Sequence, residues 1–279
     1  MGTTVLVDGL AFAEGPRWRH GRLYFSDVAA DEVLSVDMAG GLERVAEVEG
    51  GPSGLGWLPD GTMLIVRSEP AAVLALSLDG GLRTHADLSG LASFPANDMV
   101  VDSTGRAFVG CCDIAGIATG APSVSELLCV LPDGTVSVVD AEMRFPNGSV
   151  VTPDGTTLIV AETFGQGLAA FALDGDAIGP KRAWATVAGS IPDGICLDAE
   201  GAVWFADPLS RAAVRVREGG EVLDRVETEN GCFACTLGGD DGRTLFLLTG
   251  QLVAPEQNRK ERIGQIETTL VEVPGAGSP

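Results

Sequence analysis

One phrase recurs six times along the chain: an apolar run, a short turn that ends in glycine, and a second apolar run. The turn glycines are Gly21, Gly61, Gly105, Gly155, Gly201 and Gly242. Their successive spacings are 40, 44, 50, 46 and 41 residues, and each period has room for four short strands. Repeats of this length are typical of propeller blades. The sequence therefore predicts an all-β fold, a six-bladed β-propeller formed as a single domain by residues 1–279.

The two ends of the chain complete this repeat. The sixth copy has a third apolar run, QIETTLVEV, but no fourth, whereas the N-terminal run TTVLVDG precedes the first hairpin and has no other partner. A strand shared between the two ends would close the ring and remove open sheet edges. We therefore expect the N-terminal strand to lie in the last blade. Helical periodicity is scarce, so helices should be few and short.

Charge and targeting patterns restrict the partners and the compartment. The formal net charge is −21, which disfavours binding to nucleic acid or to an anionic membrane surface. No apolar run approaches the roughly 18 residues of a membrane span, and the start of the sequence lacks a basic and then apolar export signal. We expect a cytoplasmic protein whose six cysteines are reduced thiols.

Equivalent positions in the six repeats carry unusually polar residues. Counting eight residues back from each turn glycine, or seven in the shorter first hairpin, gives Glu14, Ser53, Asn97, Asn147, Asp193 and Ala234. The first strand of each propeller blade lines the central channel, so these positions should meet at one rim. Two carboxylates and two carboxamides there suit a hard divalent ion, most simply Ca²⁺ or Mg²⁺. Mn²⁺ and Zn²⁺ are also compatible with a shell of oxygen ligands.

A simpler interpretation applies to the same residues. Asn147-Gly148 and Asp193-Gly194 are dipeptides that often form turns, and polar residues before a strand often have only that role. The shared register across separate repeats favours the metal-site interpretation over isolated turns.

Several segments resemble one known family. They are AEGPRW at 13–18, NDMVVD at 97–102, RFPNGSVVTPDG at 144–155, PDGICLDAEGAVWFAD at 192–207 and ACTLGGDDGRTLF at 234–246. Through them the chain resembles the senescence marker protein, gluconolactonase and luciferin-regenerating enzyme family of six-bladed propellers. The resemblance implies a metal-dependent lactonase in which Glu14, Asn147 and Asp193 bind the metal. It also implies that Asp193 is the catalytic base and that Asn97 contacts the substrate or a metal-bound water.

The chain also departs from this family near the expected substrate pocket. Many of the family's lactonases carry an arginine and a glycine where this chain has Pro95 and Met99. The loss of that fixed cation weakens the implication of a sugar-acid lactone. The expected pocket is instead apolar, and we expect a more hydrophobic lactone or ester. The candidate lining residues, besides Asn97, are Phe94, Met99, Phe164 and Cys112.

The sequence leaves other functions open. The same ion and base would serve hydrolysis of phosphotriesters or other activated esters, and a regulatory metal-binding protein without turnover is a further alternative. A Ser-His-Asp triad is disfavoured, because His20 falls in a predicted hairpin turn and His85 in a predicted outer strand. The expected partner is a small lactone or ester molecule, and the oligomeric state is open.

Overall fold

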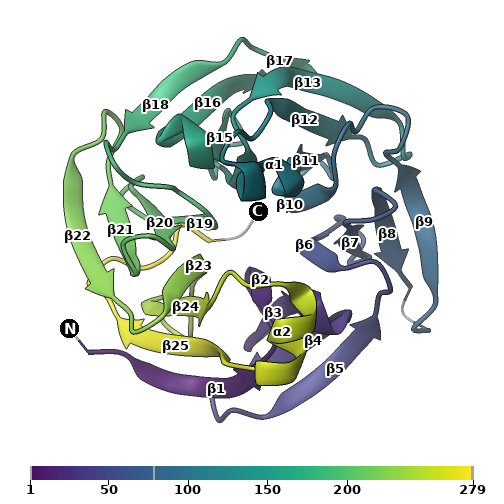
Figure 1. The fold of residues 1–279 in the computed structure, drawn as a ribbon. Coiled ribbons are helices and arrows are strands. Elements are labelled where there is room, and N and C mark those ends of the chain that lie inside the picture. Colours follow the sequence, from purple (N-terminus) through teal and green to yellow (C-terminus); the bar gives the residue numbers. More distant parts are fainter. Residues whose placement is uncertain (1, 78, 278–279) are drawn as a thin grey trace.

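The chain folds into six antiparallel sheets arranged around one axis (Figure 1). The structure is a computed structural model that describes residues 2–77 and 79–277. The other positions of the predicted 1–279 propeller, 1, 78, 278 and 279, lie outside the described residues. The innermost strand of each sheet contacts the innermost strands of the two neighbouring sheets, and these contacts run around the full ring. The predicted six-bladed propeller is confirmed.

The first three blades follow the order of the chain, with each inner strand first and each outer strand last. The first blade contains β2 (Ala13–Arg19), β3 (Arg22–Asp27), β4 (Glu32–Asp37) and β5 (Leu42–Glu47). The second contains β6 (Pro52–Trp57), β7 (Met63–Arg67), β8 (Ala72–Leu76) and β9 (Leu82–Asp87). The third contains β10 (Ala96–Val101), β11 (Ala107–Cys111), β12 (Ser125–Val130) and β13 (Val136–Met143).

The fourth and fifth blades keep this order, and the sixth joins the two ends of the chain. The fourth contains β14 (Pro146–Val151), β15 (Thr157–Glu162), β16 (Gly167–Asp174), β17 (Ala177–Ile178) and β18 (Arg182–Thr186). The fifth contains β19 (Ile195–Leu197), β20 (Val203–Asp207), β21 (Ala212–Val216) and β22 (Val222–Glu227). The sixth contains β23 (Gly231–Gly238), β24 (Thr244–Gly250), β25 (Gly264–Leu270) and β1 (Thr4–Leu10). Because β1 pairs antiparallel with β25, the N-terminal strand closes the ring as predicted.

Burial explains why the inner strands read as nearly continuous apolar runs. Each sheet packs between two neighbours, so both faces of its inner strands are covered. Every residue of β14 is buried, and so is every residue of β24. The outermost strands face solvent on one side, and β22 is therefore mostly exposed. The hydrophobic core consequently lies between adjacent blades rather than at one centre.

Helices are few and short, as the sequence predicts. In the described residues they are α1 (Ile114–Thr119), α2 (Pro255–Glu261) and the 3₁₀ turns η1 (Val28–Ala30) and η2 (Thr163–Gly165). Asp113 caps α1 by accepting a hydrogen bond of 2.8 Å from the Gly116 backbone nitrogen. In Figure 1, α1 lies close to the propeller axis. None of the described helices is long and apolar enough to cross a membrane.

The inner hairpins share an irregularity near the start of their first strand. The pairing register shifts between Glu14 and Arg17 in the first blade, and between Ala96 and Met99 in the third. Similar shifts occur at the start of β6, β14 and β23. Bulges of this kind bend a strand and redirect its side chains, and they are common next to functional sites. These bulges set the direction in which the polar side chains of the repeat point.

Candidate functional site

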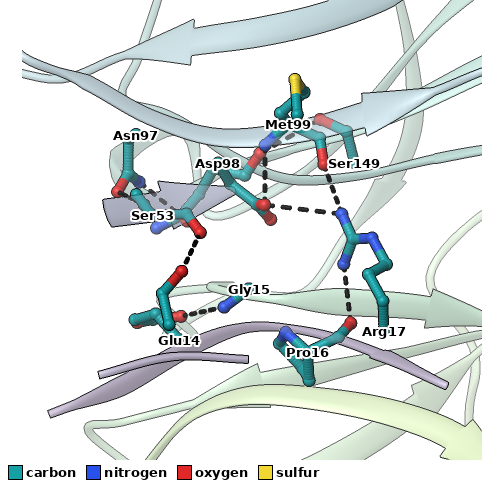
Figure 2. Close-up of polar contacts among 11 residues, drawn as sticks. Glu14, Gly15, Pro16, Arg17, Ser53, Asn97, Asp98, Met99 and Ser149 are labelled. Atoms are coloured by element: carbon teal, nitrogen blue, oxygen red, sulfur yellow. Dashed lines mark hydrogen bonds and ion pairs between the residues drawn. The ribbon is translucent and has the colours of Figure 1, made fainter. Parts of the chain in front are cut away.

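The structure brings the polar positions of the repeat together at the rim where the inner strands begin. Glu14 lies in β2, Asn97 in β10 and Asn147 in β14, whereas Asp193 lies just before β19. Asn97 Nδ2 donates a hydrogen bond of 3.2 Å to Asn147 Oδ1, and Ser53 Oγ donates one of 3.2 Å to Asn97 Oδ1. In Figure 2, Glu14 points from β2 toward the segment that carries Asn97. Five blades therefore contribute polar side chains to one cluster.

Two carboxylates of this cluster are in an electrostatically unfavourable setting. Burial raises the pKa of Glu14 well above its usual range, and repulsion by Asp193 and Asp98 adds to that rise. Burial likewise raises the pKa of Asp193, and Asp98 adds to it, while a contact with the Asn147 carboxamide opposes the rise. In the part of the chain that the structure describes, no basic side chain forms an ion pair with either carboxylate. A cation at this rim would relieve their repulsion.

Asp98 is a third carboxylate of the site, and the sequence reasoning missed it. It is buried, its Oδ1 accepts a hydrogen bond of 2.7 Å from the Met99 backbone nitrogen, and Arg17 Nη2 lies 3.5 Å from the same oxygen. Arg17 also donates to the Pro16 carbonyl oxygen at 2.8 Å and to the Met99 carbonyl oxygen (Figure 2). The guanidinium is thus held inside the ring by protein groups and is not free for an anionic substrate.

The turn interpretation of the Asn-Gly and Asp-Gly dipeptides does not hold. Neither Gly148 nor Gly194 adopts the positive φ that such turns use, and Gly148 lies within β14. Instead, each glycine faces the backbone of the next inner strand. A Cβ added to Gly194 would lie 2.6 Å from the Cβ of Ala234. The glycines after Asn147 and Asp193 therefore allow close packing of neighbouring blades.

Substitution of Gly148 tests this role. A Cβ at that position would lie 2.6 Å from Gly194 Cα and 2.7 Å from the Asp193 carbonyl oxygen, so Gly148→Ala must push Asp193 outward. We expect a loss of about 2 kcal/mol in the free energy of unfolding. Gly90→Ala is the control, because nothing lies within 4 Å of a Cβ there. Equal denaturation midpoints for both variants would contradict the packing role.

The predicted pocket residues fall into different environments. Cys112 is buried close enough to Glu14 and Asp193 for their charges to act on its thiol. Phe164 is half-buried and packs edge-on against Phe145, with ring centroids 5.3 Å apart. Cys112 therefore lies near the cluster, and Phe164 directly follows Thr163, which accepts a hydrogen bond from Asn147 Nδ2.

Met99 and Phe94 belong largely to the core between the second and third blades. Met99 is 0% exposed, and Phe94 packs against the same cluster of buried residues. The position of Met99 differs from the one predicted at the pocket lip. The bulge between Ala96 and Met99 explains this difference, because it breaks the alternation that would place Asn97 and Met99 on one face. Figure 2 shows the Met99 side chain extending away from Glu14.

Two cavities lie near the axis. One, of about 240 Å³, is lined by residues at the ends of the inner strands, such as Trp57, Val101 and Leu197, and by the C-terminal residues 275–277. It is therefore at the opposite rim from Glu14 and Asp193. The second, of about 340 Å³, is lined in part by Phe164. Phe164 follows Thr163, whose hydroxyl accepts a hydrogen bond from Asn147 Nδ2, so this cavity is connected to the polar cluster through one contact.

The cysteines and histidines do not form an alternative site. All six cysteines are free and buried, and burial raises the pKa of the Cys112 thiol. His20 lies in the turn after β2, and His85 lies in the outer strand β9. Neither is near the cluster, and a Ser-His-Asp triad is not supported.

The donor set at the rim fits a hard divalent cation. Within the described residues, no group of three or more His, Cys, Asp or Glu side chains could hold a metal ion, so a set made only of such residues is not present there. Glu14 and Asp193 instead share the rim with the carboxamide of Asn147. Mixed carboxylate and amide oxygens are ligands that Ca²⁺ accepts, with water completing the shell.

The fold and the site define a six-bladed propeller with an acidic, oxygen-rich cluster at one mouth. Residues 12–251 match the SMP-30/Gluconolactonase/LRE-like region, and the chain belongs to this family.

Three proteins show what the chain is similar to. A 6-deoxy-6-sulfogluconolactonase from Pseudomonas putida is 24% identical over 279 residues, covering 95% of this chain and 93% of that protein. Pentonolactonase XacC from Haloferax volcanii is 26% identical over 259 residues, covering 88% and 84%. The calcium-binding protein regucalcin from Agrobacterium tumefaciens has a similar structure, with a TM-score of 0.83, 22% identity and coverage of 100% and 96%. The first two make the chain a distant homologue of lactonases, and the third shows the shared fold.

Proposed function

We propose that this protein hydrolyses a lactone, a cyclic ester, to a hydroxy acid in a reaction that depends on a divalent metal ion. The observation that carries the proposal is the pair of partly buried, unpaired carboxylates, Glu14 and Asp193, beside the carboxamides of Asn97 and Asn147. Membership of the family and distant homology to two lactonases support the reaction class.

Glu14, Asn147 and Asp193 would hold the metal ion, since their oxygens share the rim. Ca²⁺ is favoured by the hard oxygen donors, with Mg²⁺, Mn²⁺ and Zn²⁺ as alternatives. A similar fold occurs in a calcium-binding regucalcin. When bound, such a cation polarises a carbonyl group and lowers the pKa of water.

The chain's own residues would then move the protons. Asp193 accepts the proton of the attacking water as general base, and the water oxygen forms a bond to the carbonyl carbon. Asn97 Nδ2, which donates to Asn147 Oδ1 in the structure, would use its second N–H to donate to the substrate carbonyl oxygen as its negative charge develops. The ring C–O bond breaks, and the proton held by Asp193 passes to the departing alkoxide. The product is a hydroxy acid.

Acid release measures this reaction directly. Protein purified without chelator should release acid from members of a lactone panel in a pH-indicator assay, well above the spontaneous rate. Metal analysis of the same sample should find about one divalent ion per chain. If the protein hydrolyses phosphotriesters or aryl esters but no lactone, the lactone proposal is wrong and the site acts on a different electrophile. A bound metal with no hydrolysis of any of these would contradict the proposal and favour a non-catalytic metal-binding protein.

A further inference from the structure

The cavity of about 340 Å³ beside the polar cluster has a mixed lining. Its volume is within the range of ligand pockets, roughly 300–1,000 Å³. It is lined by Pro122, Ser123, Val124, Arg144 and Phe164. Most of this lining is apolar or neutral, and Arg144 is the one charged residue in it.

One wall of this cavity belongs to a segment that begins at the cluster. Cys112, which lies near Glu14 and Asp193, is followed directly by Asp113. Asp113 Oδ2 accepts a hydrogen bond of 3.0 Å from the Ser123 backbone nitrogen. The segment from α1 to Ser123 is therefore anchored at the edge of the site.

The opposite wall is also tied to the cluster. Asn147 Nδ2 donates a hydrogen bond of 3.2 Å to Thr163 Oγ1, next to Phe164 in the chain. The Phe164 backbone nitrogen in turn donates one of 3.2 Å to the Arg144 carbonyl oxygen. Arg144 precedes Asn147 by three residues, a distance of at most about 11 Å along the backbone. A small molecule held at Asn147 can therefore extend to Arg144.

Arg144 brings an unpaired positive charge to this wall. Its side chain is exposed, and within residues 2–77 and 79–277 its guanidinium forms no ion pair or hydrogen bond with another side chain or with the backbone. The neighbouring carboxylate, Glu162, has other partners. Glu162 Oε1 accepts a hydrogen bond of 2.8 Å from the Arg144 backbone nitrogen and lies 3.5 Å from Lys181 Nζ.

The cation of Arg144 stands in surroundings that are otherwise negatively charged. The chain has a net charge of −21, and Glu14, Asp98 and Asp193 lie at the mouth, so the field of the protein repels anions. An anionic ligand group would need a local cation to bind here. A guanidinium forms paired, charge-assisted hydrogen bonds with carboxylates and similar oxyanions.

We propose that Arg144 binds a carboxylate or similar oxyanion carried by the substrate, at a position remote from the ester that is hydrolysed. This inference rests on the proposed lactone hydrolysis and narrows its substrate to anionic lactones. It replaces the more hydrophobic lactone expected from the loss of a cation at Pro95, because Arg144 supplies a cation from another blade. The apolar part of the cavity, around Val124 and Phe164, then contacts the uncharged body of the molecule.

Two lactones that differ only at the remote group provide the test. Glucaro-1,4-lactone carries a carboxylate where glucono-1,4-lactone carries a hydroxymethyl group. Arg144→Gln is expected to raise KM about tenfold to a hundredfold for the charged lactone, with KM for the neutral lactone within about twofold and kcat retained. Arg144→Lys should recover part of the loss. An equal change for both lactones, or none for the charged one, would overturn the proposal.

Arg83→Gln is the matched control. Arg83 is exposed on the outer strand β9, so its substitution makes the same change in net charge far from the cavity. Both KM values should stay at the level of the unmodified protein. A rise in KM for the charged lactone in this variant as well would attribute the effect to the overall field and contradict a role for Arg144.

A binding measurement separates this inference from the proposed function. Calorimetry of glucarate and gluconate at saturating Ca²⁺ needs no turnover. The unmodified protein should bind glucarate more tightly than gluconate, and Arg144→Gln should remove most of that difference. If neither lactone is hydrolysed but this difference depends on Arg144, the anion site stands and the proposed reaction falls. If Arg144→Gln leaves the difference intact, the anion site is rejected even in an active lactonase.

Discussion

Asp193→Asn is expected to lower kcat/KM for lactone hydrolysis by about 10³-fold, because an amide cannot accept the proton of the attacking water. The variant should also bind Ca²⁺ more weakly, since one negative charge leaves the site. Its metal-free form should be at least as stable as the unmodified protein, because burial already disfavours the charged form of Asp193, as its raised pKa indicates. Initial rates, Ca²⁺ calorimetry and thermal melts measure the three effects.

Asp60→Asn is the control for this substitution. Asp60 is exposed in the turn of the second blade, so the same chemical change occurs far from the mouth. It should leave turnover and Ca²⁺ affinity unchanged. Full turnover in Asp193→Asn would reject the base role, and a collapse of its melting temperature would make Asp193 a structural residue instead.

Removal of metal is expected to abolish activity, and Ca²⁺ should restore it. At a Ca²⁺ concentration one hundred times Kd, binding would stabilise the fold by about 2.7 kcal/mol, which corresponds to a rise of about 5 °C in Tm. Glu14→Gln should lose most of this rise, whereas Glu49→Gln, at an exposed position, should keep it. Turnover that persists after dialysis against EDTA would show that the reaction needs no metal.

The same experiment has a predicted pH dependence. Burial raises the pKa of Glu14 and of Asp193, so the folded metal-free protein holds protons that the unfolded chain releases. Its stability should therefore decrease as pH rises from the ordinary carboxyl pKa of about 4 toward the raised values. Stabilisation by Ca²⁺ should increase over the same interval, because protons compete with the ion at low pH. Melting temperatures measured with and without Ca²⁺ across this interval give both trends.

The architecture was predictable because its signal is local and repeated. Each hairpin is encoded by an apolar run, a turn glycine such as Gly61 or Gly155, and a second apolar run. Six copies of one signal leave little choice of fold, and the pairing of β1 with β25 follows from the missing strand in the last copy. Counting from the turn glycines also selected the polar residues at the start of the inner strands, and the structure places Asn97 in contact with Asn147.

The details of the site depended on contacts between blades, which no single repeat encodes. Asp98 follows Asn97 in the chain, but its position in the site is visible only in the folded protein. There it lies beside Arg17 of another blade and acts on the charges of Glu14 and Asp193. Likewise, the bulge in the third blade turns Met99 into the core, against the alternation expected of a regular strand.

By itself, the sequence determined the blade count and the residues at the equivalent polar position, since these depend on a pattern repeated within about 50 residues. The closure of the ring also followed from the sequence, because the last copy lacks a strand that the N-terminal run supplies. Only the tertiary structure decided which carboxylates face one another, which side chains reach the mouth, and that Arg144, which has no ion pair within the described residues, lines a cavity. These properties arise from the packing of strands that are far apart in the chain, and such packing depends on the three-dimensional course of every blade.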